Sequence, residues 1–248
     1  MIVGRPSAGK SSLVNALCQR KVAIVSPVPQ TTRNTIRGIV NDPRGQIVFL
    51  DSPGFHESER KINRRMIETI TGATDEADLV VYLIDSTRVP GNEELAITRF
   101  LAERTNPIVP VVAKCDGPRS DPDRAERFLE RHVHSACAAV RVGGLSNSVP
   151  RSDEATYTPS VEMGRVGVKE LLDRIFELLP HGPPYYPHDF YTDQDPRFRI
   201  AEIIREQAIL RAREELPHSI FVEVADIEER DETLWARAFI YVERSSQQ

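Results

Sequence analysis

The sequence predicts an α/β fold with a largely parallel sheet and one antiparallel edge strand, followed by a smaller unit of one helix and two strands. Three observations support this fold class. Short β-branched runs alternate with helix-like stretches from residue 1 to about 180, which is typical of βαβ units. Residues 41–45 join two strand patterns through a turn too short for a crossover helix. A proline-rich stretch then precedes residues 197–248.

Apolar runs and amphipathic patterns predict the elements of the first 180 residues. Strands are expected at Ile36–Val40, Gln46–Leu50, Asp78–Ile84 and Ile108–Ala113. Helices are expected at Lys10–Gln19, Ile62–Ala73, Glu93–Glu103, Asp121–Val133 and Gly167–Leu179. Residues 138–159 contain Gly143-Gly144, several serines and Pro150, and they are expected to form a loop-like insertion.

The remaining residues predict a linker and an incomplete second unit. Four prolines lie between Pro180 and Pro187, and they favour an extended backbone. A helix is expected at Arg197–Glu215, followed by strands at Ser219–Ala225 and Trp235–Val242. We therefore expect a first domain at 1–180, a linker at 181–196 and a second domain at 197–248 that is marginal on its own.

The composition indicates a globular protein. The chain has 248 residues, of which 40% are hydrophobic and 28% charged, and this excludes global disorder. Its apolar runs have the length of strands rather than the ~20 residues that a membrane span needs, and no signal peptide is expected. Three scattered cysteines indicate reduced thiols, as in the cytosol. The net charge of −5 does not by itself indicate nucleic-acid binding.

A glycine-rich motif near the start predicts a phosphate-binding loop. The residues Gly4-Arg5-Pro6-Ser7-Ala8-Gly9-Lys10-Ser11, followed by Ser12, match G-x-x-x-x-G-K-[ST]. The motif lies between a short apolar run and a helical stretch, where backbone N–H groups and the positive helix end favour phosphate. Lys10 is expected to reach the β- and γ-phosphates and the Ser11 hydroxyl to ligate Mg²⁺. The motif therefore predicts nucleotide binding.

The segment Asp51-Ser52-Pro53-Gly54, followed by Phe55, lies at the end of an expected strand. Asp51 is placed where a second contact to Mg²⁺ is required. Gly54 would let a backbone N–H approach the γ-phosphate, so that this loop can sense hydrolysis.

The polar stretch Pro29-Gln30-Thr31-Thr32-Arg33 lies between these two motifs. A threonine here could complete the Mg²⁺ shell only while a γ-phosphate is present. Thr32 is the first choice and Thr31 the second. The metal ligands are thus expected to be Ser11, Thr32 and Asp51, and the catalytic residues Lys10, Thr32 and Gly54.

The segment Ala113-Lys114-Cys115-Asp116 follows a later strand, where a base-recognition site is expected. An aspartate at this position can accept hydrogen bonds from N1 and the exocyclic amine of guanine, a pattern that adenine does not offer. Lys114 can lay its stem along the base. Asp116 and Lys114 therefore predict a preference for guanine.

Together these motifs resemble the Era family of translation-factor-class GTPases. The resemblance rests on Gly4–Ser11, Pro29–Arg33 and Asp51–His56, which stand in the expected order and spacing. It continues through Leu179–Gln194, which is similar to the Era linker, and through Ala201–Glu206 and Glu214–Ser219, which are similar to the start of its RNA-binding KH domain. It implies a P-loop NTPase G domain joined to a partial α+β type II KH domain.

The resemblance implies Mg²⁺-dependent hydrolysis of GTP to GDP and phosphate at a slow rate. It also implies binding to small-subunit ribosomal RNA near its 3′ end and assistance to assembly of the small ribosomal subunit. The protein is expected to be a cytoplasmic monomer, partly associated with the inner face of the membrane. Phe55 stands where a glutamine would orient the attacking water, and relatives share this hydrophobic substitution.

Four departures from the family pattern stand out. Ser7 and Ala113 both replace asparagines, and the loss at Ala113 is expected to weaken guanine binding by about 1 kcal/mol. The last base-contacting segment is expected at Ser160-Val161, with Ser146-Asn147 as the weaker candidate. The first strand is short. The chain stops before the G-x-x-G loop with which a KH domain clamps RNA, so RNA-binding residues cannot be named.

Three functions are compatible with these residues. The leading hypothesis is an Era-type GTPase with an incomplete RNA-binding unit. The second is a nucleotide-dependent assembly or interaction module with negligible hydrolysis, which Phe55 and Ala113 favour. The third is a P-loop ATPase, which Lys114 and Asp116 disfavour.

Overall fold

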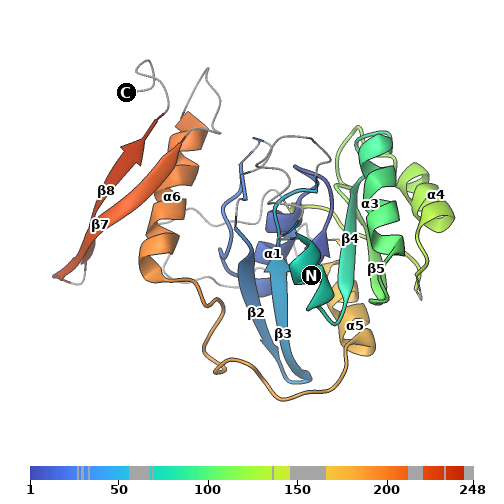
Figure 1. Ribbon diagram of the computed structural model, residues 1–248, viewed down its shortest axis with the longest axis horizontal. Helices are drawn as coiled ribbons and strands as arrows, with labels where there is room; N and C mark the ends of the chain where they lie inside the picture. The colour runs from blue at the N-terminus through green and yellow to red at the C-terminus, as the bar shows by residue number, and fades with distance from the viewer. Residues whose placement is uncertain are drawn as a thin grey trace.

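The computed structural model describes residues 1–26, 28, 31–32, 34–55, 68, 70–135, 137–145, 166–211, 220–231 and 233–242. Within these ranges, a six-stranded sheet has the order β2-β3-β1-β4-β5-β6 (Figure 1). Its strands are β1 (Ile2–Val3), β2 (Ile36–Asp42), β3 (Gly45–Asp51), β4 (Val80–Asp85), β5 (Ile108–Ala113) and β6 (Val140–Arg141). Neighbouring strands are parallel except for β2 and β3. The expected sheet with one antiparallel edge strand is confirmed.

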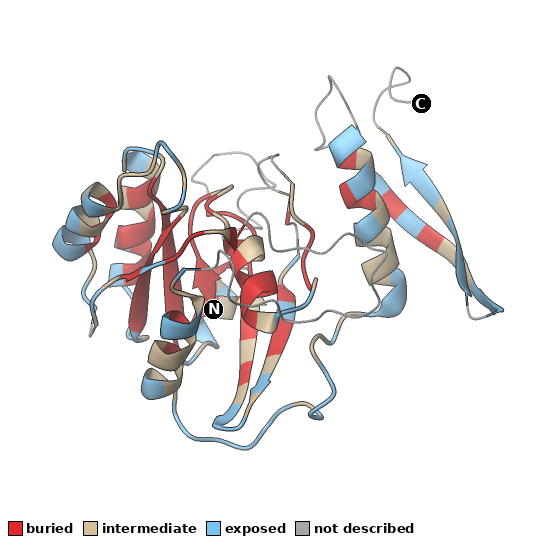
Figure 2. Cartoon of the chain, turned by 180° about the vertical axis from the view of Figure 1, so that it is seen from behind, coloured by how far each residue is buried: buried red, intermediate tan, exposed pale blue. Residues whose placement is uncertain are grey.

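Helices cover both faces of this sheet. Alternate residues of β4 point to opposite sides, so that Val81 and Leu83 join the cluster with α1 (Lys10–Cys18) and α5 (Val168–Leu178). Val80 and Tyr82 join the other cluster, with α3 (Asn92–Ala102) and α4 (Pro122–His132). Figure 2 shows the central strands buried between these layers. A strand covered on both faces must be apolar throughout, which explains the unbroken Val80–Ile84 run.

Most expected elements on described residues lie within a few residues of their expected bounds, but one expectation was wrong. Residues 62–67 and 69 of the expected helix Ile62–Ala73 lie outside the described residues. Residues 138–159 do not begin as a loop, because Val140–Arg141 form strand β6 and pair in parallel with β5. A two-residue strand has too little alternation to detect in a sequence, and here the pairing of Val140 with Val111 stabilises it. Residues 146–159 lie outside the described residues.

The proline-rich stretch lies against the sheet and is not uniformly extended, because the Phe190 N–H donates to the Pro187 carbonyl at 3.1 Å across a turn. The Ile39 N–H donates to the Tyr191 carbonyl at 2.9 Å, and the Thr192 hydroxyl donates to the Arg37 carbonyl at 2.8 Å. The Gln46 side chain accepts hydrogen bonds from two further linker amides, each at 2.9 Å. The linker thus occupies part of the free edge of β2, where unpaired backbone groups would otherwise face solvent.

After the linker come α6 (Pro196–Arg211) and a hairpin of β7 (Phe221–Arg230) and β8 (Thr233–Tyr241), seen at one side of the sheet in Figure 1. Ile209, Ile220 and Val222 form a small core between α6 and the hairpin. The expected helix and hairpin are confirmed, although residues 212–219 lie outside the described part. Among the described residues, none of the helices is long and apolar enough to cross a membrane.

Two adjacent charged residues join α6 to the first domain. Glu206 accepts a hydrogen bond from the Val25 N–H at 2.9 Å and forms an ion pair with Lys21. Arg205 donates to the Thr31 carbonyl at 2.7 Å. Because the Arg205 and Glu206 side chains are each only 4% exposed, α6 and the first domain form a packed interface here.

Candidate functional site

The phosphate-loop motif lies between β1 and α1, at the carboxyl end of a central strand. Gly9 has φ +107°, a conformation that favours glycine, and it immediately precedes the helix. A Cβ at Gly4 would lie 2.5 Å from the Leu83 carbonyl oxygen, so this position has no room for a side chain. These two glycines let the loop curl tightly over the start of α1, as an anion-binding loop requires.

Lys10 lies buried within this loop. Its ammonium donates hydrogen bonds to the carbonyls of Gly4 and Arg5, both at 3.0 Å. Burial lowers the pKa of Lys10 to about 8, although the Asp51 and Glu94 carboxylates raise it. The ammonium is therefore held at the loop by neutral carbonyls and has no close carboxylate partner among the described residues, which makes it suited to an incoming anion.

Ser11, Thr32 and Asp51 converge beside the loop. The Ser11 hydroxyl donates to Asp51 Oδ2 at 2.6 Å and lies 3.0 Å from the Thr32 hydroxyl. Asp51 is fully buried at the end of β3, and its Oδ1 has no hydrogen-bond partner among the described residues. Burial raises the pKa of Asp51 to about 6, opposed by the Ser11 hydrogen bond and by Lys10. Three hard oxygen donors and one unsatisfied carboxylate oxygen fit a divalent cation such as Mg²⁺.

The two neighbouring threonines face different partners. The Thr32 hydroxyl lies against Ser11, whereas the Thr31 hydroxyl donates to the Val28 carbonyl at 2.7 Å and lies 2.6 Å from Ser26 Oγ. Thr31 is thus bound within its own turn, and Thr32 is the one at the oxygen cluster.

The loop after β3 packs directly on the phosphate loop. The Phe55 N–H donates to the Gly4 carbonyl at 3.0 Å, and the Ser52 hydroxyl donates to the Ile2 carbonyl at 3.0 Å. A Cβ at Gly54 would lie 2.6 Å from both the Cα and the nitrogen of Pro6. Gly54 therefore permits a backbone contact that no other residue would allow.

Phe55 is turned into the protein rather than toward the phosphate loop. Its ring is buried and lies 5.2 Å from the ring of Phe100 on α3. An apolar ring held in this core has no group with which to orient a water molecule.

The base-recognition segment begins where β5 ends. Ala113 is the last, fully buried residue of β5, and Lys114 has φ +60°. The Lys114 ammonium donates to the Ser7 carbonyl and to Asp85 Oδ2, each at 2.7 Å. Cys115 is half-buried, and its N–H donates to the Val142 carbonyl at 3.1 Å. Through the Lys114 hydrogen bond, Ser7 is held at the end of β5, and within the described part of the chain its own buried hydroxyl has no hydrogen-bond partner.

The structure brings a segment to Asp116 that sequence reasoning missed. Gly143 follows β6, and a Cβ there would lie 3.0 Å from Asp116 Oδ1. Gly143 thus lies beside the predicted guanine-selecting carboxylate. The apolar alternation of Val140 and Val142 before two glycines was the available signal. Ser160 and Val161, together with the weaker candidate at 146–147, lie outside the described residues.

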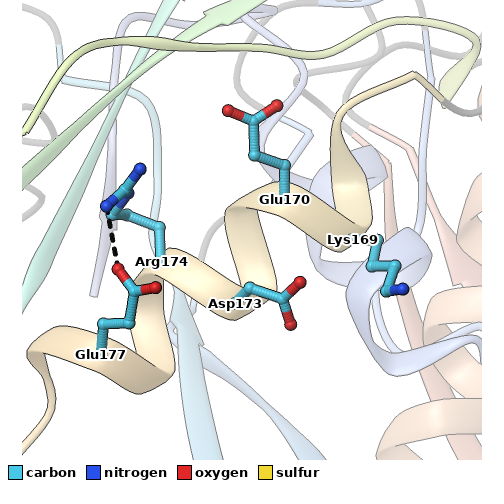
Figure 3. Close-up of a pocket in the computed structure, with 5 residues that line it drawn as sticks. All are labelled: Lys169, Glu170, Asp173, Arg174 and Glu177. Atoms are coloured by element: carbon cyan, nitrogen blue, oxygen red, sulfur yellow. Dashed lines mark hydrogen bonds and ion pairs between the residues drawn. The ribbon is translucent and has the colours of Figure 1, made fainter.

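A surface hollow elsewhere has a different character. It is lined by five charged side chains of α5: Lys169, Glu170, Asp173, Arg174 and Glu177 (Figure 3). The last two form an ion pair at 2.8 Å. All five come from one helix, and none belongs to a predicted motif, so this hollow is not the nucleotide site.

Comparison with known proteins gives these motifs a family. A family model described as 50S ribosome-binding GTPase matches residues 1–114. The GTPase Era of Treponema pallidum is 43% identical over 256 aligned residues, covering 100% of this chain and 79% of that protein. Two solved structures each match with TM-score 0.83 at 30% identity, covering 99% of this chain and 78% of theirs. One is Era in complex with MgGDPNP and nucleotides 1506–1542 of 16S ribosomal RNA, and the other is a variant of Aquifex aeolicus Era bound to GDP·AlF4⁻.

Proposed function

This chain is a P-loop GTPase of the Era family, and we propose that the residues gathered at the ends of β1, β3 and β5 carry its reaction. One observation supports this assignment most: four side chains that are up to 41 residues apart in sequence converge at one point beside the phosphate loop. They are Lys10, Ser11, Thr32 and Asp51. The substrate is GTP, and the products are GDP and phosphate.

Mg²⁺ would be held by Ser11, Thr32 and Asp51. The unpartnered Asp51 Oδ1 supports this fit, because a buried carboxylate oxygen without a hydrogen bond is otherwise unfavourable. When bound, the metal supplies positive charge that offsets the negative charge of the phosphates. Thr32 belongs to a segment that can contact the metal in one nucleotide state and leave it in another.

The protein's own residues supply the remaining chemistry. Lys10 and the loop amides would stabilise the charge that develops on the γ-phosphate as water attacks in line. The Gly54 backbone N–H would contact the γ-phosphate. Phe55 leaves the attacking water without a side-chain partner at this position, so slow turnover is expected.

Asp116 would select guanine, with Lys114 along the base and Gly143 beside the Asp116 carboxylate. The surrounding nucleotide-binding set is the phosphate loop from Gly4 to Ser12, the Asp51–Phe55 loop and the Ala113–Asp116 segment. Gly143 and Ala113 offer fewer side-chain contacts than larger residues would, so guanine would be recognised chiefly through Asp116.

We extend the proposal to the whole chain. Residues 1–180 would form the G domain, 181–196 the linker and 197–248 part of a KH domain. By family resemblance the protein would act on small-subunit ribosomal RNA and in assembly of the small ribosomal subunit, as a cytoplasmic monomer with peripheral membrane association. The Era structure in complex with a 16S ribosomal RNA fragment supports the RNA part.

Titration with labelled GDP and ADP tests the site. GDP is expected to bind much more tightly than ADP, and equal or tighter binding of ADP would overturn the assignment. Lys10→Ala is expected to lose nucleotide affinity. Asp75→Asn serves as a control, because this carboxylate is exposed and pairs with Arg104, which belongs to none of the motifs.

The buried position of Phe55 keeps one alternative in view, a nucleotide-dependent assembly or interaction module with negligible hydrolysis. Single-turnover GTP hydrolysis separates the two. A wild-type rate above that of Lys10→Ala supports the GTPase, and equal rates support the interaction module.

A further inference from the structure

Carboxylates from β4 and α3 surround the second residue of the phosphate loop. The Arg5 guanidinium lies 4.0 Å from Asp85, 3.8 Å from Glu93 and 3.4 Å from Glu94. The Asp85 and Glu94 side chains are each only 1% exposed, so water does little to screen them. Buried charges of this kind persist only where they are paired and hydrogen-bonded.

Asp85 is bonded through both carboxylate oxygens. Its Oδ1 accepts from the Thr87 N–H at 2.9 Å and from the Thr87 hydroxyl at 2.6 Å. Its Oδ2 accepts from the Lys114 ammonium at 2.7 Å. Burial raises the pKa of Asp85, but the Lys114 and Thr87 hydrogen bonds outweigh it and hold that pKa below its usual range. The carboxylate is therefore charged and fixed in orientation.

The same Lys114 ammonium joins Asp85 to the phosphate loop, because it also donates to the Ser7 carbonyl at 2.7 Å. The lysine backbone is held from the same turn, since the Ser86 hydroxyl donates to the Lys114 carbonyl at 3.1 Å. The β4 end thus contacts the phosphate loop at Arg5 and the base-recognition segment at Lys114. Neither contact requires a nucleotide to be present.

From this bridge we infer that Asp85 is a positioning residue for guanine-nucleotide binding, acting through Lys114. The lysine side chain is 40% exposed and would otherwise sample many rotamers. Because its ammonium is held between Asp85 and Ser7, the Lys114 stem is already fixed between the base-recognition segment and the phosphate loop before the nucleotide binds. The conformational entropy of the Lys114 side chain is thus lost during folding, so nucleotide binding does not have to offset that loss. The inference rests on the proposed role of Lys114 at the base.

Steady-state hydrolysis and GDP affinity of Asp85→Asn, Lys114→Met and the double variant test this coupling. Asp85→Asn is expected to raise the KM for GTP and the Kd for GDP about tenfold with kcat unchanged, because a contact made equally in ground and transition states affects only binding. The double variant is expected to bind no more weakly than Lys114→Met alone. Asp85→Glu, which keeps the charge, is expected to recover part of the lost affinity. The control variant Asp75→Asn is expected to leave KM and Kd unchanged.

Thr87→Val provides a second route, in case Asp85→Asn does not fold. Thr87 is half-buried, and its valine variant removes one hydrogen bond that orients the Asp85 carboxylate. It is expected to weaken GDP binding about threefold, and to have no effect in the Lys114→Met background.

The outcomes separate the inference from the proposal on which it rests. If Lys114→Met leaves GDP affinity unchanged, the base-recognition assignment fails, and the inference fails with it. If Lys114→Met weakens binding while Asp85→Asn and Thr87→Val do not, only the inference fails. Additive losses, or a fall in kcat with KM unchanged, would indicate that Asp85 only stabilises the fold and would overturn the inference.

Discussion

Glu206 is the residue whose removal most directly tests whether α6 is docked on the G domain in solution. Its carboxylate accepts from the Val25 N–H at 2.9 Å and pairs with Lys21, while being only 4% exposed. A buried hydrogen bond to a charged group contributes about 2 kcal/mol. The Lys21 side chain is 31% exposed, so screening limits that pair to about 0.5–1 kcal/mol.

Glu206→Ala is therefore expected to shift the docking equilibrium by about 2.5–3 kcal/mol, which corresponds to a factor of about 100. Residue-resolved amide hydrogen exchange measures this at the Val28 N–H, because Val28 packs against the small core of α6 and the hairpin only while α6 is docked, whereas the Val25 N–H loses its acceptor in the variant itself. Exchange of the Val28 N–H is expected to accelerate about 100-fold, with the Val81 amide of the central sheet unchanged. Gln207→Ala, at an exposed neighbouring position of α6, is the control. An increase below threefold, or an equal effect in the control, would refute the reasoning.

Two further predictions concern the nucleotide site itself. Gly54→Ala would bring a Cβ to 2.6 Å from the Pro6 backbone and is expected to lower the free energy of unfolding by about 1–3 kcal/mol. Gly182→Ala, where the new Cβ would point into open space, is expected to leave that free energy unchanged. Chemical denaturation without nucleotide measures both variants, and equal stability of the two would contradict the packing argument. Mg²⁺-dependent GDP affinity is expected to fall below about pH 6, where Asp51 becomes protonated, and above about pH 8, where Lys10 loses its proton. Calorimetric titration between pH 5 and 9 checks this, and an affinity independent of pH would contradict the assigned roles.

The same two groups make the opposite contribution to the stability of the nucleotide-free chain. The folded pKa of Asp51 is above its unfolded value, so its stabilising contribution is present in acid and is lost as the pH rises through about 6. The folded pKa of Lys10 is below its unfolded value, so its contribution becomes more favourable as the pH rises above about 8. Between these values both groups are charged and buried. The site is thus least favourable for folding in the pH range in which it is expected to bind best.

α6 contacts residues that adjoin the proposed metal ligand Thr32. Arg205 holds the Thr31 carbonyl, and the next residue, Thr32, lies at the proposed metal site. A change at Thr32 therefore acts on a segment that α6 contacts at Val25 and at Thr31.

Local pattern predicted much of the fold and the site. The phosphate-loop motif needs a fixed order of residue types between a strand and a helix, and that order is contiguous in the sequence. The fully apolar Val80–Ile84 and Ile108–Ala113 runs indicated buried strands for the same reason. Asp51 could be proposed as a metal ligand from the sequence because it ends such a run and follows the phosphate loop at a characteristic distance.

Other features could not be predicted, because each depends on a partner far along the chain. Strand β6 is two residues long, and only its pairing with β5 defines it. Gly143 lies against Asp116 only because that pairing places the two strand ends together. Nothing in the sequence near Asp85 indicates that its carboxylate meets Lys114, 29 residues later.

The sequence by itself determined the chemistry of this protein: which side chains can meet a phosphate, a metal ion and a guanine. The tertiary structure decided their arrangement: which threonine faces the proposed metal site, which glycine lies against Asp116, and how the linker and α6 lie against the G domain. The physical reason is that residue types set the possible interactions, whereas hydrogen bonds between distant segments form only when the packing of the sheet brings their ends within about 3 Å.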